Sequence, residues 1–274
     1  MTQLDVRIDH AQVYTGDAPN SDDVPFASGQ MRSVGIVDGR LALDVSPATP
    51  ADRTIDATGL TLAPGFIDIH SHSDYAAFYA PNATSKVLAG ITTELNGNCG
   101  YGAFPLRGPM KQHRQEEYES RGLTIDWATV DEYFTRADRN PMALNQGLLV
   151  GHGTLRGSVV GMGDGSADKS QVRVMQREVE RAMRVGCFGL STGLVYAPGC
   201  FAEREEIVAL AEVTASHDGV YASHLRSESD QLVEALDEFL SVCEQTGCRA
   251  QYSHTKTAGR RNWNKLADVR RRMD

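Results

Sequence analysis

The sequence predicts an α/β protein: a parallel barrel of the (β/α)8 TIM type, with about six of its eight strands present, preceded by a small N-terminal β domain. From residue 61 onward, short apolar runs alternate with helix-like segments, a pattern typical of parallel strands joined by helical crossovers. Residues 1–60 show strand patterns joined by turns. Metal-binding residue types follow several of the later apolar runs, at the strand ends where barrel enzymes build their sites.

Composition bounds the class of protein. The chain has 274 residues, of which 41% are hydrophobic and 23% charged, as is ordinary for a globular protein. A net charge of -9 argues against a nucleic-acid partner, which would require a basic surface. The five cysteines are odd in number and widely spaced, so we expect no disulfide framework. Without a leader pattern at the start or an apolar run of about 20 residues, we expect a cytoplasmic protein with no membrane partner.

Residues 1–60 are expected to form the small β domain. Residues 6–8 and 33–37 alternate in polarity, and the dipeptide Asp38-Gly39 precedes another short apolar run at 40–43. Such a dipeptide is a strong hairpin signal, because glycine adopts the positive φ that these turns need. Residues 54–59 close the segment, and residues 19–30 are expected to be a polar loop.

Residues 61–274 are expected to form the barrel. Candidate strands are 65–69, 92–95, 147–150, 188–190, 220–222 and 249–252. Apolar residues at helical spacing predict helices around 127–134, 172–183, 207–213, 232–243 and 263–269, the last with Asn262 as its N-cap.

Polar residues follow these strands in order. The first strand ends in His70-Ser71-His72, and two histidines two residues apart on a strand point to the same face. Zinc-ligand types end the second, fifth and sixth strands as well. The predicted metal ligands are therefore His70, His72, Cys99, His224 and His254.

Each residue also has a structural interpretation. Cys99 alone would be a small buried hydrophobe, but its position after a strand and between polar and glycine residues favours a ligand. His224 and His254 singly could be hydrogen-bonded core histidines. His152, after the third strand, is predicted to contact substrate or support the ligands, with a satisfied rim histidine as the alternative.

Zinc in such a site would activate water and polarise a carbonyl, which predicts hydrolysis of an amide or related bond. A general base is then needed. Asp68 is a poor candidate because strand alternation points it away from His70, and Asp74 in the following loop is possible but unsupported.

The motifs resemble a known family. The segment from Pro64 to Asp74 looks like the opening motif of the amidohydrolase superfamily. More narrowly, the D-aminoacylase (N-acyl-D-amino-acid deacylase) family is resembled by residues 90–93, 97–100, 150–156, 189–199, 221–226 and 253–259. The resemblance runs from about residue 30 to the end of the chain.

This resemblance implies one tightly bound zinc held by Cys99, His224 and His254, and a second, weaker position at His70 and His72. Cys99 takes the place that a carboxylated lysine fills in hydantoinases and dihydroorotases. The implied substrate is a small N-acyl-D-amino acid, and a cation is chemically suited to its carboxylate. The residues implied near substrate are Lys256, Arg226 and Tyr196, with a rim salt bridge as the alternative for Arg226.

The family's catalytic aspartate follows the eighth strand, which would lie beyond Asp274, so no catalytic residue is assigned in this chain. We expect the 274 residues to be a C-terminally incomplete piece that is inactive or nearly so by itself. The alternative functions are a D-dipeptidase, a cyclic-imide hydrolase, or a catalytically incomplete metal-binding fragment. Acyl and side-chain specificity, the number of metals and the oligomeric state stay open.

Overall fold

The structure is a computed structural model that describes residues 3–15 and 29–273. The chain divides into two compact units, Met1–Gly65 and Phe66–Asp274, and each is described by itself. The polar loop expected at 19–30 lies almost entirely outside the described residues. None of the helices in the described ranges has the length and apolar character needed to cross a membrane.

The first unit is a small β-sheet. Its strands are β1 (Leu4–Val13), β2 (Gln30–Val37), β3 (Arg40–Leu43), β4 (Ala51–Asp56) and β5 (Thr61–Leu62). The order is β3-β2-β1-β4, with β5 paired to β1. Asp38 and Gly39, which join the antiparallel strands β2 and β3, have φ values of 49° and 69°. Both values suit the hairpin turn expected at this dipeptide.

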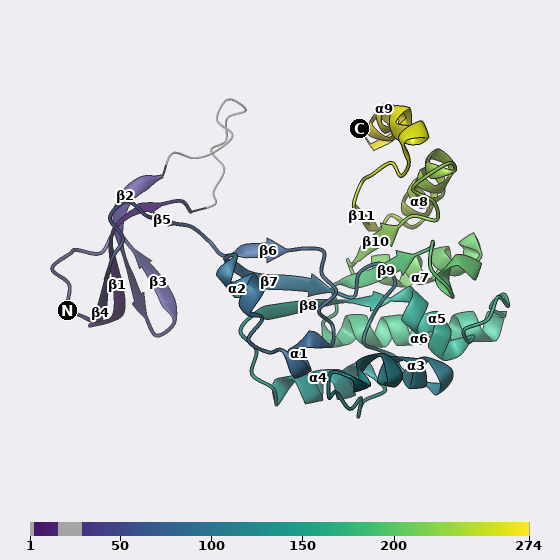
Figure 1. Cartoon of the computed structure of the whole chain (residues 1–274), viewed down its shortest axis with the longest axis horizontal. Coiled ribbons are helices and arrows are strands. Elements are labelled where there is room, and N and C mark those ends of the chain that lie inside the picture. Colours follow the sequence, from purple (N-terminus) through teal and green to yellow (C-terminus); the bar gives the residue numbers. More distant parts are fainter. Residues whose placement is uncertain (1–2, 16–28, 274) are drawn as a thin grey trace. The chain divides into compact units, whose positions relative to one another are not determined.

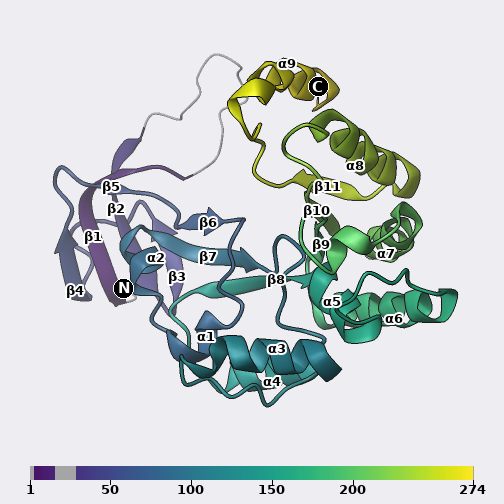
Figure 2. The same cartoon turned by 45° about the vertical axis from the view of Figure 1, so that its right-hand side comes forward.

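The second unit is built on a six-stranded sheet. Its strands are β6 (Phe66–Asp68), β7 (Ile91–Asn96), β8 (Asn145–Gly151), β9 (Gly189–Gly193), β10 (Val220–His224) and β11 (Arg249–Tyr252). They lie side by side in chain order, and every neighbouring pair is parallel. The sheet curls, with helices on its outer side (Figures 1 and 2). This confirms the predicted TIM-type barrel class, with six consecutive strands present.

Helices connect these strands. They are α1 (Ala76–Tyr79), α2 (Thr84–Leu88), α3 (Gly108–Glu119), α4 (Val130–Asp138), α5 (His152–Val159), α6 (Lys169–Val185), α7 (Arg204–Ser216), α8 (Leu232–Thr246) and α9 (Leu266–Met273), with short 3-10 helices η1 (Gly199–Phe201) and η2 (Arg260–Lys265). Local signals set several of the ends. Asp168 and Gln171 form a capping box at the start of α6, and Gly186 ends that helix in the left-handed conformation.

Two expectations about the helices were wrong or incomplete. Asn262 is not the N-cap of the last helix. It lies inside η2, four residues before α9 begins at Leu266, and its amide donates to Asp230 and to the carbonyl of Ala258. Helices α3 and α5 were not predicted, because α3 is rich in charged residues and α5 contains two glycines.

The core of the second unit lies between the sheet and the helices. Strand residues such as Leu148, Val150 and Leu190 pack in one cluster with Leu210 on α7 and with Trp127, which lies in the loop before α4. The helices cover the outer face of the sheet. The loops that follow the carboxyl ends of the strands form the candidate site.

Candidate metal centre

A cavity of about 570 Å³ lies at the carboxyl ends of the strands in the second unit. Its walls come from the loops after β6, β7, β9 and β11, from His224 at the end of β10, and from helix α3. All five residues predicted as metal ligands line this cavity: His70, His72, Cys99, His224 and His254.

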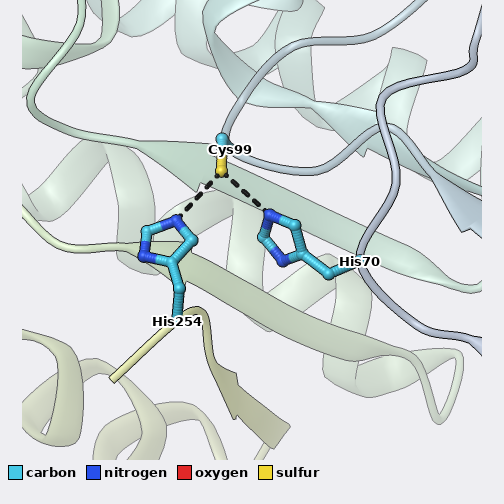
Figure 3. Close-up of side chains that lie close together, drawn as sticks. All are labelled: His70, Cys99 and His254. Atoms are coloured by element: carbon cyan, nitrogen blue, oxygen red, sulfur yellow. Dashed lines mark hydrogen bonds between the residues drawn. The ribbon is translucent and has the colours of Figure 1, made fainter. Parts of the chain in front are cut away.

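Three of these residues bring their ligand atoms together (Figure 3). The Sγ atom of Cys99 lies 3.3 Å from Nε2 of His70 and 3.4 Å from Nε2 of His254. All three ligand atoms lie within 4.8 Å of one another. We call Cys99, His70 and His254 the cavity triad.

The backbone around Cys99 holds its thiol in place. Cys99 has a φ of 53°, a left-handed conformation that is uncommon for residues other than glycine. Its carbonyl oxygen approaches Gly193 so closely that a Cβ there would lie 2.0 Å from it. Gly97, two residues earlier, similarly presses against the backbone of Leu149, where a Cβ would lie 2.1 Å from the carbonyl oxygen. A side chain at either glycine would therefore displace the loop that carries Cys99.

The two histidines of the first motif do not lie on a strand, as expected from their spacing, because β6 ends at Asp68. Their rings are nevertheless adjacent, with centroids 5.4 Å apart. The loop is held by two contacts to β7. Ser71 donates its N–H to the carbonyl of Leu95 at 3.1 Å, and Ser73 donates its N–H to the side-chain oxygen of Asn96 at 2.7 Å.

A buried polar cluster centred on Glu94 contacts this loop through the hydroxyl of Ser71. This cluster was not predicted from the sequence. Glu94 on β7 is almost fully buried and accepts hydrogen bonds from Asn96 at 3.1 Å and Gln146 at 2.8 Å. Lys86 on α2 contacts Glu94 and pairs with Asp68 at 2.9 Å. Asp68 is thus engaged by Lys86 outside the cavity, consistent with its rejection as a general base.

The fourth histidine belongs to a second, overlapping group. Nε2 of His224 lies 3.4 Å from Oε1 of Glu228, and the ring of His224 lies 4.3 Å from that of His254 between centroids. His224, Glu228 and His254 form a second set of possible metal-binding groups. The structure therefore unites Cys99 with His70 and His254, whereas the implied arrangement joined Cys99 to His224 and His254. Glu228, four residues after His224, was missed.

Burial sets the charge of these groups. It lowers the pKa of His70 and of His72, and it lowers the pKa of His224 to about 4, so these rings are neutral at neutral pH. Burial also raises the pKa of the Cys99 thiol to about 11. Neutral imidazoles keep a lone pair available for a cation.

The donor set of the cavity triad fits a zinc ion. One sulfur and two imidazole nitrogens are ligands that zinc prefers, and three protein ligands leave one position open, as in catalytic zinc sites. A coordinated thiol loses its proton, because the cation reverses the effect of burial on its pKa.

Two predicted substrate residues lie at the cavity. Lys256 lines it with a half-exposed side chain, and its Nζ atom lies 2.9 Å from Oε1 of Glu228. Tyr196 also lines it, with its ring 4.9 Å from that of His224 between centroids. Both side chains can reach a molecule bound beside the cavity triad.

The structure does not bring Arg226 to this cavity. Its guanidinium pairs with Glu238 at 2.9 Å and donates to the carbonyl of Cys200 at 2.8 Å. The salt-bridge alternative therefore describes Arg226 in this structure.

His152 also lies outside the cavity lining, so its contact with substrate stays a prediction. It is fully buried, and its Nε2 atom lies 2.7 Å from Oε1 of Glu206. Arg156 pairs with the same oxygen at 3.2 Å. We call His152, Arg156 and Glu206 the sealed cluster.

Other polar groups complete the site. Asp74 is fully buried and outside the cavity lining, and burial raises its pKa to about 7. On the unpredicted helix α3, Arg114 lies 3.7 Å from the ring centre of Tyr101 and donates to Glu117 at 2.7 Å. Arg114 and Glu117 on α3 and Tyr101 in the loop after β7 all line the cavity.

A model of the amidohydrolase family matches residues 53–249. The chain therefore belongs to the amidohydrolase family. Within it, the chain lies among the D-aminoacylases, as its resemblances predicted. It is 37% identical over 245 residues to an N-acyl-D-glutamate deacylase, and 31% identical over 243 residues to a D-aminoacylase, both from Alcaligenes xylosoxydans xylosoxydans. Each match covers 88% of this chain.

Solved structures agree with this family. An N-acyl-D-glutamate deacylase from Bordetella bronchiseptica, in complex with zinc and a phosphonate inhibitor that mimics the tetrahedral intermediate, matches 100% of this chain at a TM-score of 0.88 and 31% identity. A D-aminoacylase studied for its binuclear metal centre matches 97% at a TM-score of 0.85 and 30% identity. This chain covers 56% and 54% of those two chains, and about half the length of the curated relatives.

Proposed function

We propose that this protein is a zinc-dependent hydrolase that cleaves the amide bond of N-acyl-D-amino acids, giving a carboxylate and a D-amino acid. The observation that carries the proposal is the cavity triad, in which Cys99, His70 and His254 converge within 4.8 Å at a cavity of about 570 Å³. Relatives named for deacylation of N-acyl-D-glutamate and N-acyl-D-aspartate, at 37% and 36% identity, support this substrate class.

The cavity triad would hold the tightly bound ion through one thiolate and two imidazole nitrogens. Zinc in such a site supplies a Lewis acid that polarises a carbonyl and lowers the pKa of water. His72 and His224 also line the cavity and are the residues available for a second, weaker position. This proposal exchanges the roles of His70 and His224 relative to the set implied by the resemblance.

Lys256 is proposed to bind the substrate carboxylate. Its half-exposed ammonium lines the cavity, and an ammonium–carboxylate pair is a strong, charge-assisted contact. Tyr196 is proposed to donate its hydroxyl proton in a hydrogen bond near the scissile carbonyl. Burial raises the pKa of Tyr196, so the hydroxyl keeps this proton at neutral pH. We assign the general base to none of the described residues.

Zinc content and stereospecific turnover test the function. The full-length protein should contain at least one zinc per chain and release amine from N-acetyl-D-glutamate or another N-acetyl-D-amino acid. The matching N-acetyl-L-amino acids serve as the control and should react far more slowly. Zinc without turnover of any N-acyl-D-amino acid would contradict the deacylase proposal and leave a metal-binding role. D-dipeptides and cyclic imides in the same assay test the other hydrolase specificities.

A further inference from the structure

Glu228 lies against three nitrogen atoms at the edge of the candidate metal centre. Its Oε1 atom is 2.9 Å from Nδ1 of His254, 2.9 Å from Nζ of Lys256 and 3.4 Å from Nε2 of His224. This oxygen is buried, and among the described residues it has no partner at hydrogen-bond angles. We propose that Glu228 is a positioning residue that fixes the tautomer of His254, so that Nε2 of the ring is free to bind the metal. This inference rests on the proposed zinc site.

The two ring nitrogens of His254 face different partners. Nε2 lies 3.4 Å from Sγ of Cys99, on the side of the cavity triad, whereas Nδ1 faces Glu228. A neutral imidazole carries its proton on one nitrogen, and only the other nitrogen can bind a cation. Nε2 can therefore act as a ligand only when the proton resides on Nδ1, where an acceptor must hold it.

Lys256 competes for the same nitrogen. Its Nζ atom lies 3.2 Å from Nδ1 of His254, and an ammonium can only donate. When Lys256 donates to Nδ1, the ring proton must reside on Nε2. Nε2 then has no lone pair to offer the metal. Glu228 opposes this state twice, because its carboxylate can accept the Nδ1 proton and can also hold the ammonium of Lys256.

The backbone fixes Glu228 relative to His254. Glu228 follows β10, and His254 follows the neighbouring strand β11. The carbonyl of Glu228 accepts a hydrogen bond from the N–H of Ala258 at 2.6 Å, which ties the two loops together. The carboxylate is therefore held on the Nδ1 side of the His254 ring.

Zinc affinity of the purified full-length protein, measured by competition with a chelator, tests this role. Glu228→Ala should weaken zinc binding roughly 10- to 100-fold, the range typical of partners that orient a ligand. Glu228→Gln should retain most of the affinity, because its amide oxygen still accepts from Nδ1. Lys256→Ala should bind zinc at least as tightly as wild type, and adding it to Glu228→Ala should recover part of the loss.

Glu178→Ala is the matched control. Its side chain is 15% exposed against 13% for Glu228, and it pairs with Arg107 away from the cavity, so its zinc affinity should equal that of wild type. Thermal unfolding of the metal-free variants identifies any loss of the fold itself. If Glu228→Ala does not fold, the comparison of Glu228→Gln and Lys256→Ala with wild type still decides.

Several results would overturn the inference. Equal zinc affinity in Glu228→Ala and wild type would remove the role of Glu228 while leaving the zinc site intact. Equal losses in Glu228→Gln and Glu228→Ala would identify Glu228 as a direct ligand with His224 instead. Weaker zinc binding in Lys256→Ala than in wild type would refute the proposed competition of Lys256 with Glu228 for Nδ1 of His254. A wild-type protein without zinc would overturn the proposed function and this role with it.

Discussion

The cavity triad and the sealed cluster both contain a histidine that follows a barrel strand, yet they differ in what holds the ring nitrogens. In the sealed cluster, Nε2 of His152 already has a carboxylate partner at 2.7 Å, and Arg156 and Glu206 are buried with it. In the cavity triad, the nitrogens of His70 and His254 meet only the sulfur of Cys99 on that side. The nitrogen of His152 without a partner, Nδ1, is buried away from the cavity, whereas His70 and His254 line it, so only the triad histidines can offer a lone pair to a cation there.

The difference originates in distant parts of the chain. Glu206 lies on α7, 54 residues after His152, and both α7 and the helix α5 that begins at His152 contact β9. The triad residues have no acidic group between them, and the cavity keeps their shared side open. Four experiments test whether the two histidine environments differ in this way.

Glu206→Ala should have the largest effect of the four, and it should act on the stability of the fold. It leaves the His152 ring and the Arg156 guanidinium buried without their shared acceptor, which should lower the free energy of unfolding by about 3–5 kcal/mol. Urea unfolding measures the loss. Glu178→Ala removes a more exposed pair and should cost less than about 1 kcal/mol. A similar small loss in both variants would show that the sealed cluster is not structural.

Cys99→Ser should have its main effect on zinc. A hydroxyl replaces the thiolate that zinc prefers, so zinc affinity should fall by more than the roughly 100-fold upper range for residues that only orient ligands. Chelator competition measures the change. Cys200→Ser changes a cysteine outside the cavity and should bind zinc as wild type does. Unchanged affinity in Cys99→Ser would exclude the thiol as a ligand.

Gly193→Ala should affect stability and zinc together. The new Cβ would lie 2.0 Å from the carbonyl oxygen of Cys99, and relief of such overpacking typically costs about 1–3 kcal/mol. Because the strain falls on the loop that carries the thiol, zinc affinity should fall as well. Gly163→Ala is the control, since a Cβ there meets nothing within 4 Å. Equal behaviour of the two variants would refute the close fit.

The smallest effect should be on the dependence of stability on pH. Burial opposes ionisation of Glu206, but the hydrogen bond with His152 and the charges of His152 and Arg156 outweigh it, so the pKa lies below its ordinary value of 4.5. The ionised carboxyl therefore contributes its full stability above about pH 4.5, and this contribution is lost as the pH falls through the lowered pKa. In urea unfolding between pH 7 and pH 3, the free energy of unfolding should fall more steeply for wild type than for Glu206→Gln. Parallel curves would contradict this.

Much of the fold follows from local patterns in the sequence. Short apolar runs bounded by polar residues predicted all six barrel strands, although β6 and β11 are mostly exposed. The same patterns could not predict α3, because its buried residues Met110, Arg114 and Tyr118 include a charged one. Arg114 is buried there only because Tyr101 and Glu117 surround it, and that environment is a product of tertiary packing.

The candidate site was predicted as a set of residue types but not as an arrangement. Strand ends identified His70, Cys99 and His254 because parallel strands share one edge. The contact between Glu228 and His254 was not predictable from the sequence. Glu228 lies within a polar segment, where a charged residue is usually solvated, and it meets His254 only because β10 and β11 are neighbouring strands. Arg226, two residues earlier, has the same local context but turns to Glu238 on α8.

The left-handed backbone at two members of the cavity triad limits how this site could be transferred to another protein. Cys99 and His254 have φ values of 53° and 39°, conformations that a regular strand or helix does not provide. A designer who copied only the three side chains onto ideal elements would aim the sulfur and the ring wrongly. The unit to graft is the whole pair of loops, together with the glycines against which the first one rests.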